Sequence, residues 1–467
     1  MVRLLTAPLF LATRLIQLAV LVEVALLLVD LEPYRAQLER SASDALAMEV
    51  RIEGPVRLSV LAGPRIALHD VRVRSGGVEL AAVDSARLGL HLAALDARQL
   101  PGAEVELHGV RLHIERNHRG FNFALARRPG QAPPTFALAR LHMSDASLRF
   151  ADRVSGFRLD ADGCRLSSRE IGAAGAAQDD LWRALAFRAR LDCRRIRSGD
   201  IVLTRVRAHL SAERGVLTLD PVEWRALGGV GRGSLRAHLA GAVPRFETRV
   251  RLSRLRAEEL SRGLPGNTRA HGTLDLSLDL SLRGTGRAAL VRSAEGEIGL
   301  RGRDLVLEGI DLDQVISRFE SSQRVKLLDF GALLYAGPLG LLFSRGVNLA
   351  SAIPDSGGRT HVSMVVSDWK LTGGVAQAQD VAFATRAHRI ALRGNIDLRN
   401  ERFDNLVFAV VGADGCARLP HSVNGPFDAP ELDRPGALAS FAGPVLRLFR
   451  GLSGCEVFYA GAVPAPS

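Results

Sequence analysis

The chain has 467 residues, a length that fits about three average domains or one elongated repetitive unit. Its composition, 47% hydrophobic and 24% charged, argues against a wholly disordered chain and against a protein that crosses a membrane many times. The net charge of +11 comes almost entirely from arginine, because Lys326 and Lys370 are the only lysines. The arginines are dispersed through alternating segments without any groove-reading or base-stacking motif, so we expect no nucleic acid partner.

The first thirty residues contain a long apolar segment. Leu4–Val29 carries only Arg14 and Glu23 as charges, and as a helix it reaches about 39 Å, enough for a hydrocarbon core of about 30 Å. The segment ends without the small residues of a signal-peptide cleavage site. We therefore predict an uncleaved single-pass anchor, domain 1–30, with Arg3 on the cytoplasmic side and the bulk of the chain across the membrane. A buried amphipathic helix of a soluble protein is the alternative.

The four cysteines fall into two local pairs, Cys164 with Cys193 and Cys416 with Cys455. Neither pair has the spacing of a zinc site or of a redox motif. In an oxidising compartment each pair could form a disulfide, which would contribute about 3 to 4 kcal/mol. Four inert buried thiols are the alternative, and the sequence decides neither the bonding nor the connectivity.

After the anchor, apolar residues recur at helical spacing over 33–48, which predicts a short helix. From residue 50 onward the period changes to two, the period of a β-strand with one buried face. The strictest alternation is Leu274–Leu282, while the change of register at His108 and Gly109 predicts a bulge or a tight bend. Strands are expected at 50–60, 71–73, 105–114, 148–150, 187–191, 202–210, 216–219, 246–255, 274–282, 360–366, 381–384, 390–398 and 406–411.

The predicted fold is mainly β: an elongated, curled antiparallel sheet with a few short helices toward the C-terminus. Gly-rich and polar turns between the strands favour antiparallel meanders over crossover connections. The apolar face has to close into a barrel, pack on a second sheet or line a groove, and the periodicity leaves that choice open. We expect one β region over 31–300 and a second over 301–467, with short helices at 257–264, 312–323, 327–343 and 435–449.

Eight short fragments then carry a family resemblance in their order and spacing. They are similar to segments of the AsmA family, whereas residues 125–290 match that family in strand pattern only. The fragments are Asp30–Arg35, Val50–Val60, Ile66–Val73, Leu107–Arg116, Gly120–Asn122, Leu305–Leu312, Leu392–Leu398 and Gly425–Pro430.

The resemblance implies a periplasmic protein of Gram-negative bacteria, anchored in the inner membrane and akin to the bridge-like lipid transfer proteins. Its implied role is outer-membrane biogenesis through phospholipid movement between membranes, with envelope proteins as further partners. The family brings no catalytic residue, cofactor or metal. The segment 327–343 is expected to touch a membrane or a partner, or to cap the end of the groove. The groove lining that the resemblance implies is Leu274, Leu276, Leu278, Leu280, Leu282, Val105 and Leu107.

A phospholipid that leaves a bilayer exposes its acyl chains at a cost of about 0.8 kcal/mol per CH2, which an apolar groove would offset. About thirty strands at a spacing of ~4.8 Å give at most ~140 Å of groove. A shuttle, a conduit completed by a partner and an assembly role therefore stay open. Two other functions compete with lipid transfer: a non-catalytic assembly factor for outer-membrane proteins, and an envelope hydrolase.

Three short motifs imitate functional ones. Asp329–Gly331 matches the magnesium triplet of kinases without the accompanying kinase motifs, and Gly228–Gly233 is glycine-rich without the strand, helix and lysine of a phosphate loop. A third group of histidines and acids alternates with apolar residues, as the solvated face of a strand does, so we expect no metal there. Its members are His108, His113, His118, Glu104, Glu106 and Glu115.

Overall fold

The structure is a computed structural model. It describes residues 32–46, 48–59, 65–89, 103–118, 120–122, 136–173, 181–261, 269–314, 316–317, 358–433 and 455–466. The predicted anchor, the segment 327–343 and the helix expected at 435–449 lie outside these residues. Among the helices within them, none is long and apolar enough to cross a membrane.

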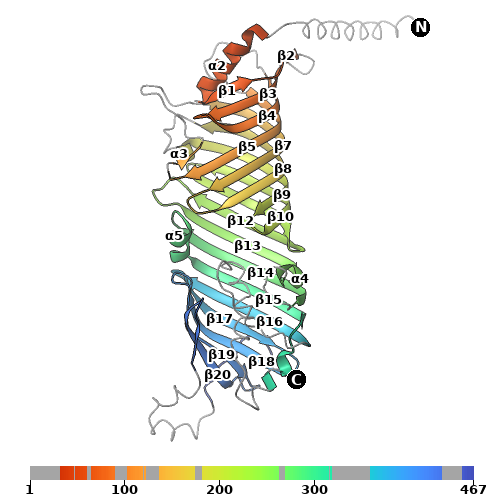
Figure 1. Cartoon of the computed structure of the whole chain (residues 1–467), viewed down its shortest axis with the longest axis vertical. Coiled ribbons are helices and arrows are strands. Elements are labelled where there is room, and N and C mark those ends of the chain that lie inside the picture. The colour runs from red at the N-terminus through yellow and green to blue at the C-terminus, as the bar shows by residue number, and fades with distance from the viewer. Residues whose placement is uncertain are drawn as a thin grey trace, which may run out of the picture. The chain divides into compact units, whose positions relative to one another are not determined.

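The described residues are dominated by β-strands (Figure 1). They divide into two compact units. The first unit contains the described residues up to Trp224 together with Ala237–Ala242. Its elements are η1 (Glu32–Tyr34), α2 (Arg35–Leu46), β1 (Glu49–Ile52), β2 (Val56–Ser59), β3 (Arg65–Ser75), β4 (Val78–Gly89), β5 (Ala103–Asn117), β6 (Gly120–Phe121), β7 (Phe136–Asp152), β8 (Arg158–Ala173), α3 (Leu181–Ala184), β9 (Leu185–Ser198), β10 (Ile201–Glu213) and most of β11 (Val216–Ala226).

The second unit contains Arg225–Arg236 and the described residues from Val243 onward. Its elements are most of β12 (Gly229–His238), then β13 (Arg245–Arg256), α4 (Ala257–Ser261), β14 (Arg269–Arg283), α5 (Arg287–Arg292), β15 (Glu295–Glu308), β16 (Arg359–Thr372), β17 (Val375–Ala384), β18 (Arg389–Asp397), β19 (Arg402–Val411), β20 (Ala417–Pro426) and β21 (Glu431–Asp433). The helix expected at 33–48 is confirmed by η1 and α2, and the first part of the helix expected at 257–264 by α4.

Within the first unit, strands β3 to β10 pair in chain order apart from the two-residue β6, and β1 and β2 both pair with β3. The expectation of antiparallel meanders is wrong at one place, because β5 and β7 run parallel. The 18 residues between these strands, 118–135, are long enough to return the chain to the starting edge of the sheet, which a parallel neighbour requires.

A row of backbone irregularities crosses the sheet of the first unit. The bend predicted at His108 and Gly109 is confirmed: Gly109 has φ +66°, and a Cβ at this position would overlap the carboxylate of Asp84. The same positive φ recurs at this level of the sheet on β3, β7, β8 and β10, whereas the described residues of β4 and β9 have none there. The positions of the row, in strand order, are Asp70, Gly109, Asp145, Gly163 and Arg205.

This bulge row explains why the observed strands are longer than the predicted ones. A bulge shifts the alternation by one residue, so that apolar side chains on both sides of it reach the same face. On β7, for instance, Met143 and Ala146 pack on that face although their spacing is three. The two halves of a strand therefore have separate period-two patterns in the sequence. Only 148–150 was expected as a strand where β7 spans Phe136–Asp152.

Helix α2 covers the open edge of β1. Arg35, Glu39 and Ser43 recur every four residues and so lie on one side of the helix. The guanidinium of Arg35 donates to the carbonyl oxygen of Ile52 at 3.1 Å, while a carboxylate oxygen of Glu39 accepts from the amide of Ile52 at 2.7 Å. The hydroxyl oxygen of Ser43 accepts from the amide of Val50 at 3.0 Å. These contacts satisfy backbone groups that an edge strand leaves free, so another strand cannot add there.

In the second unit, the pairing is antiparallel from β13 through β21. Residues 455–466, which we call the C-terminal strap, lie against one face of β16 to β19. On this face Tyr459 and Val463 pack with small side chains from the strands. The row Ala382, Ala391 and Ala409 lets the strap approach the sheet closely.

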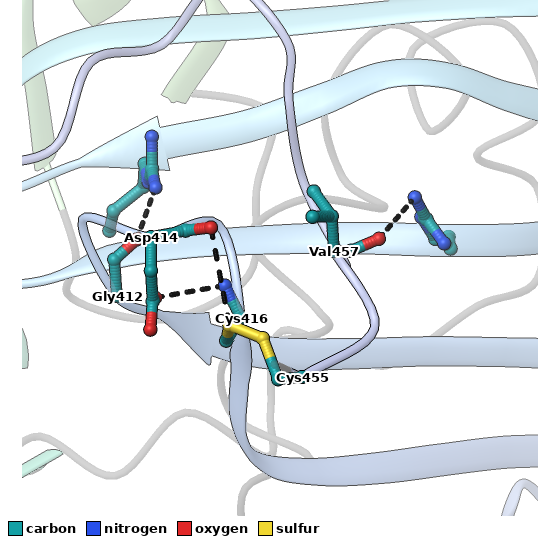
Figure 2. Close-up of a disulfide and its surroundings, with 7 residues drawn as sticks. Gly412, Asp414, Cys416, Cys455 and Val457 are labelled. Atoms are coloured by element: carbon teal, nitrogen blue, oxygen red, sulfur yellow. Dashed lines mark hydrogen bonds between the residues drawn. A yellow bond between two sulfur atoms is a disulfide. The ribbon is translucent and has the colours of Figure 1, made fainter. Parts of the chain in front are cut away.

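Polar contacts and a disulfide hold the strap in place. The hydroxyl of Tyr459 donates to a carboxylate oxygen of Asp380 at 2.6 Å, and the guanidinium of Arg389 donates to the carbonyl oxygen of Val463 at 3.1 Å. Burial, together with the hydrogen bond to Asp380, raises the pKa of Tyr459 above its usual value. Figure 2 shows the disulfide between Cys416, next to the turn after β19, and Cys455 at the start of the strap.

We expect Cys455→Ser to lower the free energy of unfolding of the full chain by about 3 to 4 kcal/mol, the chain-entropy value for closing a loop of this size. The two cysteines are 39 residues apart. Urea unfolding in detergent without reductant measures the effect. Val457→Ser is the matched control, since Val457 is an exposed strap residue and its replacement should stay within about 0.5 kcal/mol. Equal stability of the two variants would mean that the strap stays in place without the disulfide.

Candidate functional site: an apolar sheet face

The five leucines expected to line a groove lie on one face of β14. Leu274, Leu276, Leu278, Leu280 and Leu282 alternate with polar residues, and in an extended strand alternate side chains point to the same face. The register with β13 places Val250 opposite Leu278 and Phe246 opposite Leu282. The apolar face therefore extends sideways over both strands.

The same face continues from β14 across the next strands of the second unit. Leu276 lies opposite Leu300 of β15, which pairs with Ser367 of β16 and then with Val381 of β17. A second row starts at Leu278 and continues through Ile298 to Trp369. Each row crosses the sheet at right angles to the strands, so the face is continuous and not a set of separate patches.

Burial divides this continuous face into two zones. Leu300 is 5% exposed, and Ile298, Trp369 and Val381 are buried at least as deeply. Leu276, Leu278, Leu280 and Leu282 are only half-buried, as are Phe246 and Val250 on β13. We call these six residues the half-exposed leucine patch. A patch of this kind has apolar surface still available for a ligand.

The first unit has an apolar face of its own, which includes the other two expected lining residues. Val105 lies between Leu88 and Leu141 on the neighbouring strands, and Leu107 lies between Ala86 and Met143. Both side chains are half-buried. The structure thus places Val105 and Leu107 on one unit and the five leucines on the other.

The sequence did not decide whether the two cysteines of this unit pair. In the structure they form a disulfide on the same apolar face. Cys164 and Cys193 are directly opposite each other on β8 and β9, with their Cα atoms 4.0 Å apart, and both are buried. They stand next to Gly163 and so next to the bulge row. The bond fixes the register of two strands where the alternation changes.

The opposite face of each sheet carries charge in cross-strand ion pairs. In the second unit Arg249 contacts Asp279 at 2.9 Å and Arg301 contacts Asp368 at 2.7 Å. In the first unit Arg111 contacts Asp84 at 2.7 Å, and its hydrogen bond lowers the pKa of that carboxyl. These pairs are solvent-exposed and contribute little stability each. Their effect is to keep one face of the sheet hydrated while the other stays apolar.

Among the residues discounted as a metal site, His108 and the three acids have other partners. The nitrogen Nδ1 of His108 lies 3.1 Å from the hydroxyl of Ser144. The three acids contact arginines of neighbouring strands or turns: Glu104 with Arg140, Glu106 with Arg65, and Glu115 with Arg153. Within the part of the chain that the structure describes, one trio has its metal-ligand atoms close together: Asp414, Cys416 and Cys455. Its two sulfurs are joined in the disulfide of Figure 2 and are not thiolates.

A polar cluster in the second unit was not anticipated from the sequence. Asp313 accepts a hydrogen bond from the hydroxyl of Thr385 at 2.5 Å and lies 2.9 Å from Nδ1 of His388. The hydroxyl of Thr385 points to the carboxylate and not to the imidazole, so the histidine does not activate it. More than 70 positions separate Asp313 from the other two residues, and no local motif could have indicated the contact.

Fold and surface together define a class of protein: a mainly antiparallel β-sheet protein in which each of two units has one hydrated charged face and one apolar face. Residues 174–347 match the model of the AsmA family. The match confirms the resemblance predicted from the sequence, and the chain carries an AsmA-family region over these residues. The matched range includes the fragment at 305–312 and also the middle strands, where the sequence showed only a strand pattern. No curated protein and no solved structure matches the chain.

The two zones of the apolar face lead to different expected costs of truncation. Leu300→Ala should lower the free energy of unfolding of the lipid-free full chain by about 2 to 5 kcal/mol, because it opens a cavity among buried side chains. Its cross-strand partner Leu276 is half-exposed, so Leu276→Ala should cost less than about 1.5 kcal/mol. Urea unfolding measures both variants. Equal costs would show that Leu276 is packed as firmly as Leu300.

Proposed function

We propose that this chain is a non-catalytic protein of the bacterial cell envelope that binds phospholipid and carries it between the inner and outer membranes. The observation that carries the proposal is the half-exposed leucine patch, which continues across the sheet into buried rows on the same face. The AsmA-family match over 174–347 supports a role in the envelope.

The chemistry of the two faces fits an acyl chain with a polar head. Moving a methylene group from the bilayer interior into water costs about 0.8 kcal/mol of free energy. Contact of the acyl chain with Leu276, Leu278 and Leu280 offsets that cost. The head group stays hydrated, as do the arginines and aspartates on the other face. Transfer by this route is a partition between apolar environments, so it needs no catalytic group, cofactor or metal.

The proposed location is the periplasmic side of the inner membrane, with residues 1–30 as a single-pass anchor. Both cysteine pairs are joined as disulfides in the structure, which supports an oxidising compartment. Helix α2 begins a few residues after the proposed anchor, and its Leu38 and Ala42 pack against the apolar face of the first unit. Helix α2 would therefore cover the apolar face of the first unit at its β1 end. Lipid would then enter between the ends of the strands.

The test is phospholipid that copurifies with the full chain, measured by mass spectrometry after mild detergent extraction. Replacing Leu276 and Leu278 together by Asp puts two carboxylates on the apolar face and should lower bound phospholipid at least about fivefold. Ser277→Asp is the matched control. It adds the same group to the same strand on the opposite face, where the register places it beside Arg251, and it should retain the bound lipid.

An equal lipid content in the two variants would remove the leucine patch from the binding surface. Deletion of the chain tests one alternative, a non-catalytic assembly factor for outer-membrane proteins. Lipid transfer predicts altered lipid composition of the outer membrane. Loss of particular outer-membrane proteins with unchanged lipids would instead favour the assembly role.

A further inference from the structure

Exposed apolar side chains of the first unit gather along one edge of its sheet. The turns after β3, β5, β7 and β9 share this edge, because every second turn of the series returns to the same side. We call it the turn edge. Six large exposed apolar residues lie on these turns or at the adjoining end of α2: Leu46, Val78, Val154, Phe157, Ile201 and Val202. Among the described residues of this unit, Tyr34 is the one such residue that lies elsewhere.

One described turn on the other edge has a different character. The turn between β10 and β11 is formed by Glu213, Arg214 and Gly215, and Arg214 contacts Glu213 at 3.1 Å. Exposed apolar residues are normal when scattered singly. Six of the seven such residues described in this unit lie along one edge, over about six strand spacings of ~4.8 Å or about 29 Å.

The most prominent tip is fixed in its outward geometry. In the turn between β7 and β8, the carboxylate of Asp152 accepts from the amide of Val154 at 2.9 Å and from the hydroxyl of Ser155 at 2.7 Å. The ring of Phe157 lies 6.0 Å from that of Phe150, and Phe157 is still 46% exposed. A tip held in this way loses little conformational freedom when it inserts into an apolar phase.

Basic residues stand beside these tips. Arg74, Arg158 and Arg197 are exposed near the turns. The register places Glu49 opposite Arg74 and Asp160 opposite Arg197 on neighbouring strands, but these carboxylates form no ion pair with the two arginines among the described residues. Three acids of this edge are already held, Glu79 by Arg72, Glu115 by Arg153 and Asp152 by Arg116. Asp160 and Asp200 remain exposed.

We propose that the turn edge docks on the surface of an anionic lipid bilayer. Val154, Phe157 and Ile201 insert at the boundary between head groups and acyl chains, while Arg74, Arg158 and Arg197 contact lipid phosphates. Separate protruding tips with basic neighbours fit a deformable interface better than a protein partner, which needs a contiguous complementary surface. This docking surface belongs to the first unit and is distinct from the leucine patch of the second.

The experiment uses the full chain reconstituted in vesicles of mixed phosphatidylglycerol and phosphatidylcholine. A photoreactive benzoylphenylalanine replaces Phe157 in one sample and Val243 in the control. Val243 is 59% exposed but belongs to the second unit. After irradiation, mass spectrometry should find lipid adducts at position 157 at least about fivefold above those at position 243. A protein adduct at 157, or equal lipid adducts at both positions, overturns the proposal.

Charge provides a second readout. In a chain with Arg74, Arg158 and Arg197 replaced by Gln, the lipid adduct at position 157 should fall at least about fivefold, as it should in vesicles of phosphatidylcholine alone. An unchanged yield in either sample contradicts a role for anionic head groups. Phospholipid that copurifies with this variant should stay at the level of the unaltered chain, so this outcome is separate from that of the proposed function.

The variant Leu276→Asp with Leu278→Asp distinguishes docking from lipid transport. Its adduct at position 157 should persist, because the turn edge would touch the bilayer directly. Loss of the adduct in this variant would mean that the lipid found at position 157 depends on the leucine patch, and the docking proposal would fall.

Discussion

The constraint on which the first unit depends is that each strand must present apolar side chains to one face on both sides of a bulge. A residue with positive φ changes the alternation on β3, β5, β7, β8 and β10, and the apolar face stays continuous only if the strands between them change alternation at the same level. The register places these residues in one row from Asp70 to Arg205, and the spacing of three between the buried Val83 and Ala86 shows the same change on β4. The buried disulfide between Cys164 and Cys193 lies beside the row and holds two strands in that register.

In the second unit, the charge and the burial of the two sheet faces change from strand to strand. On β13 to β15 the outer face is charged, with pairs such as Arg301 and Asp368, whereas on β16 to β19 it is lined with alanines and covered by the C-terminal strap. On the other face burial is complete at Ile298 and Trp369 but only partial at Leu278 of the same row. The apolar surface left uncovered is thus a limited zone on β13 and β14, and the proposed function rests on it.

Much of the fold could be predicted from the residues, because period-two alternation is a local property. Leu274–Leu282 indicated both a strand and its apolar face, and Leu107 followed by Val110 indicated the bend at Gly109. The parallel pairing of β5 with β7 had no local signal, since the direction of a strand relative to its neighbour depends on the path of the connection. The cluster of Asp313, Thr385 and His388 was missed for the same reason, as its members are distant in sequence.

By itself, the sequence determined that the chain is mainly β, that one face of each strand is apolar, and that the chain resembles the AsmA family. These properties follow from side-chain alternation and from short fragments, which need no knowledge of neighbours. Only the tertiary structure decided how bulges align across strands, which cysteines pair, and that the apolar face is only half-buried at Leu276 and Leu278. Register and burial depend on which strands lie side by side, and the sequence of a single strand does not specify its neighbours.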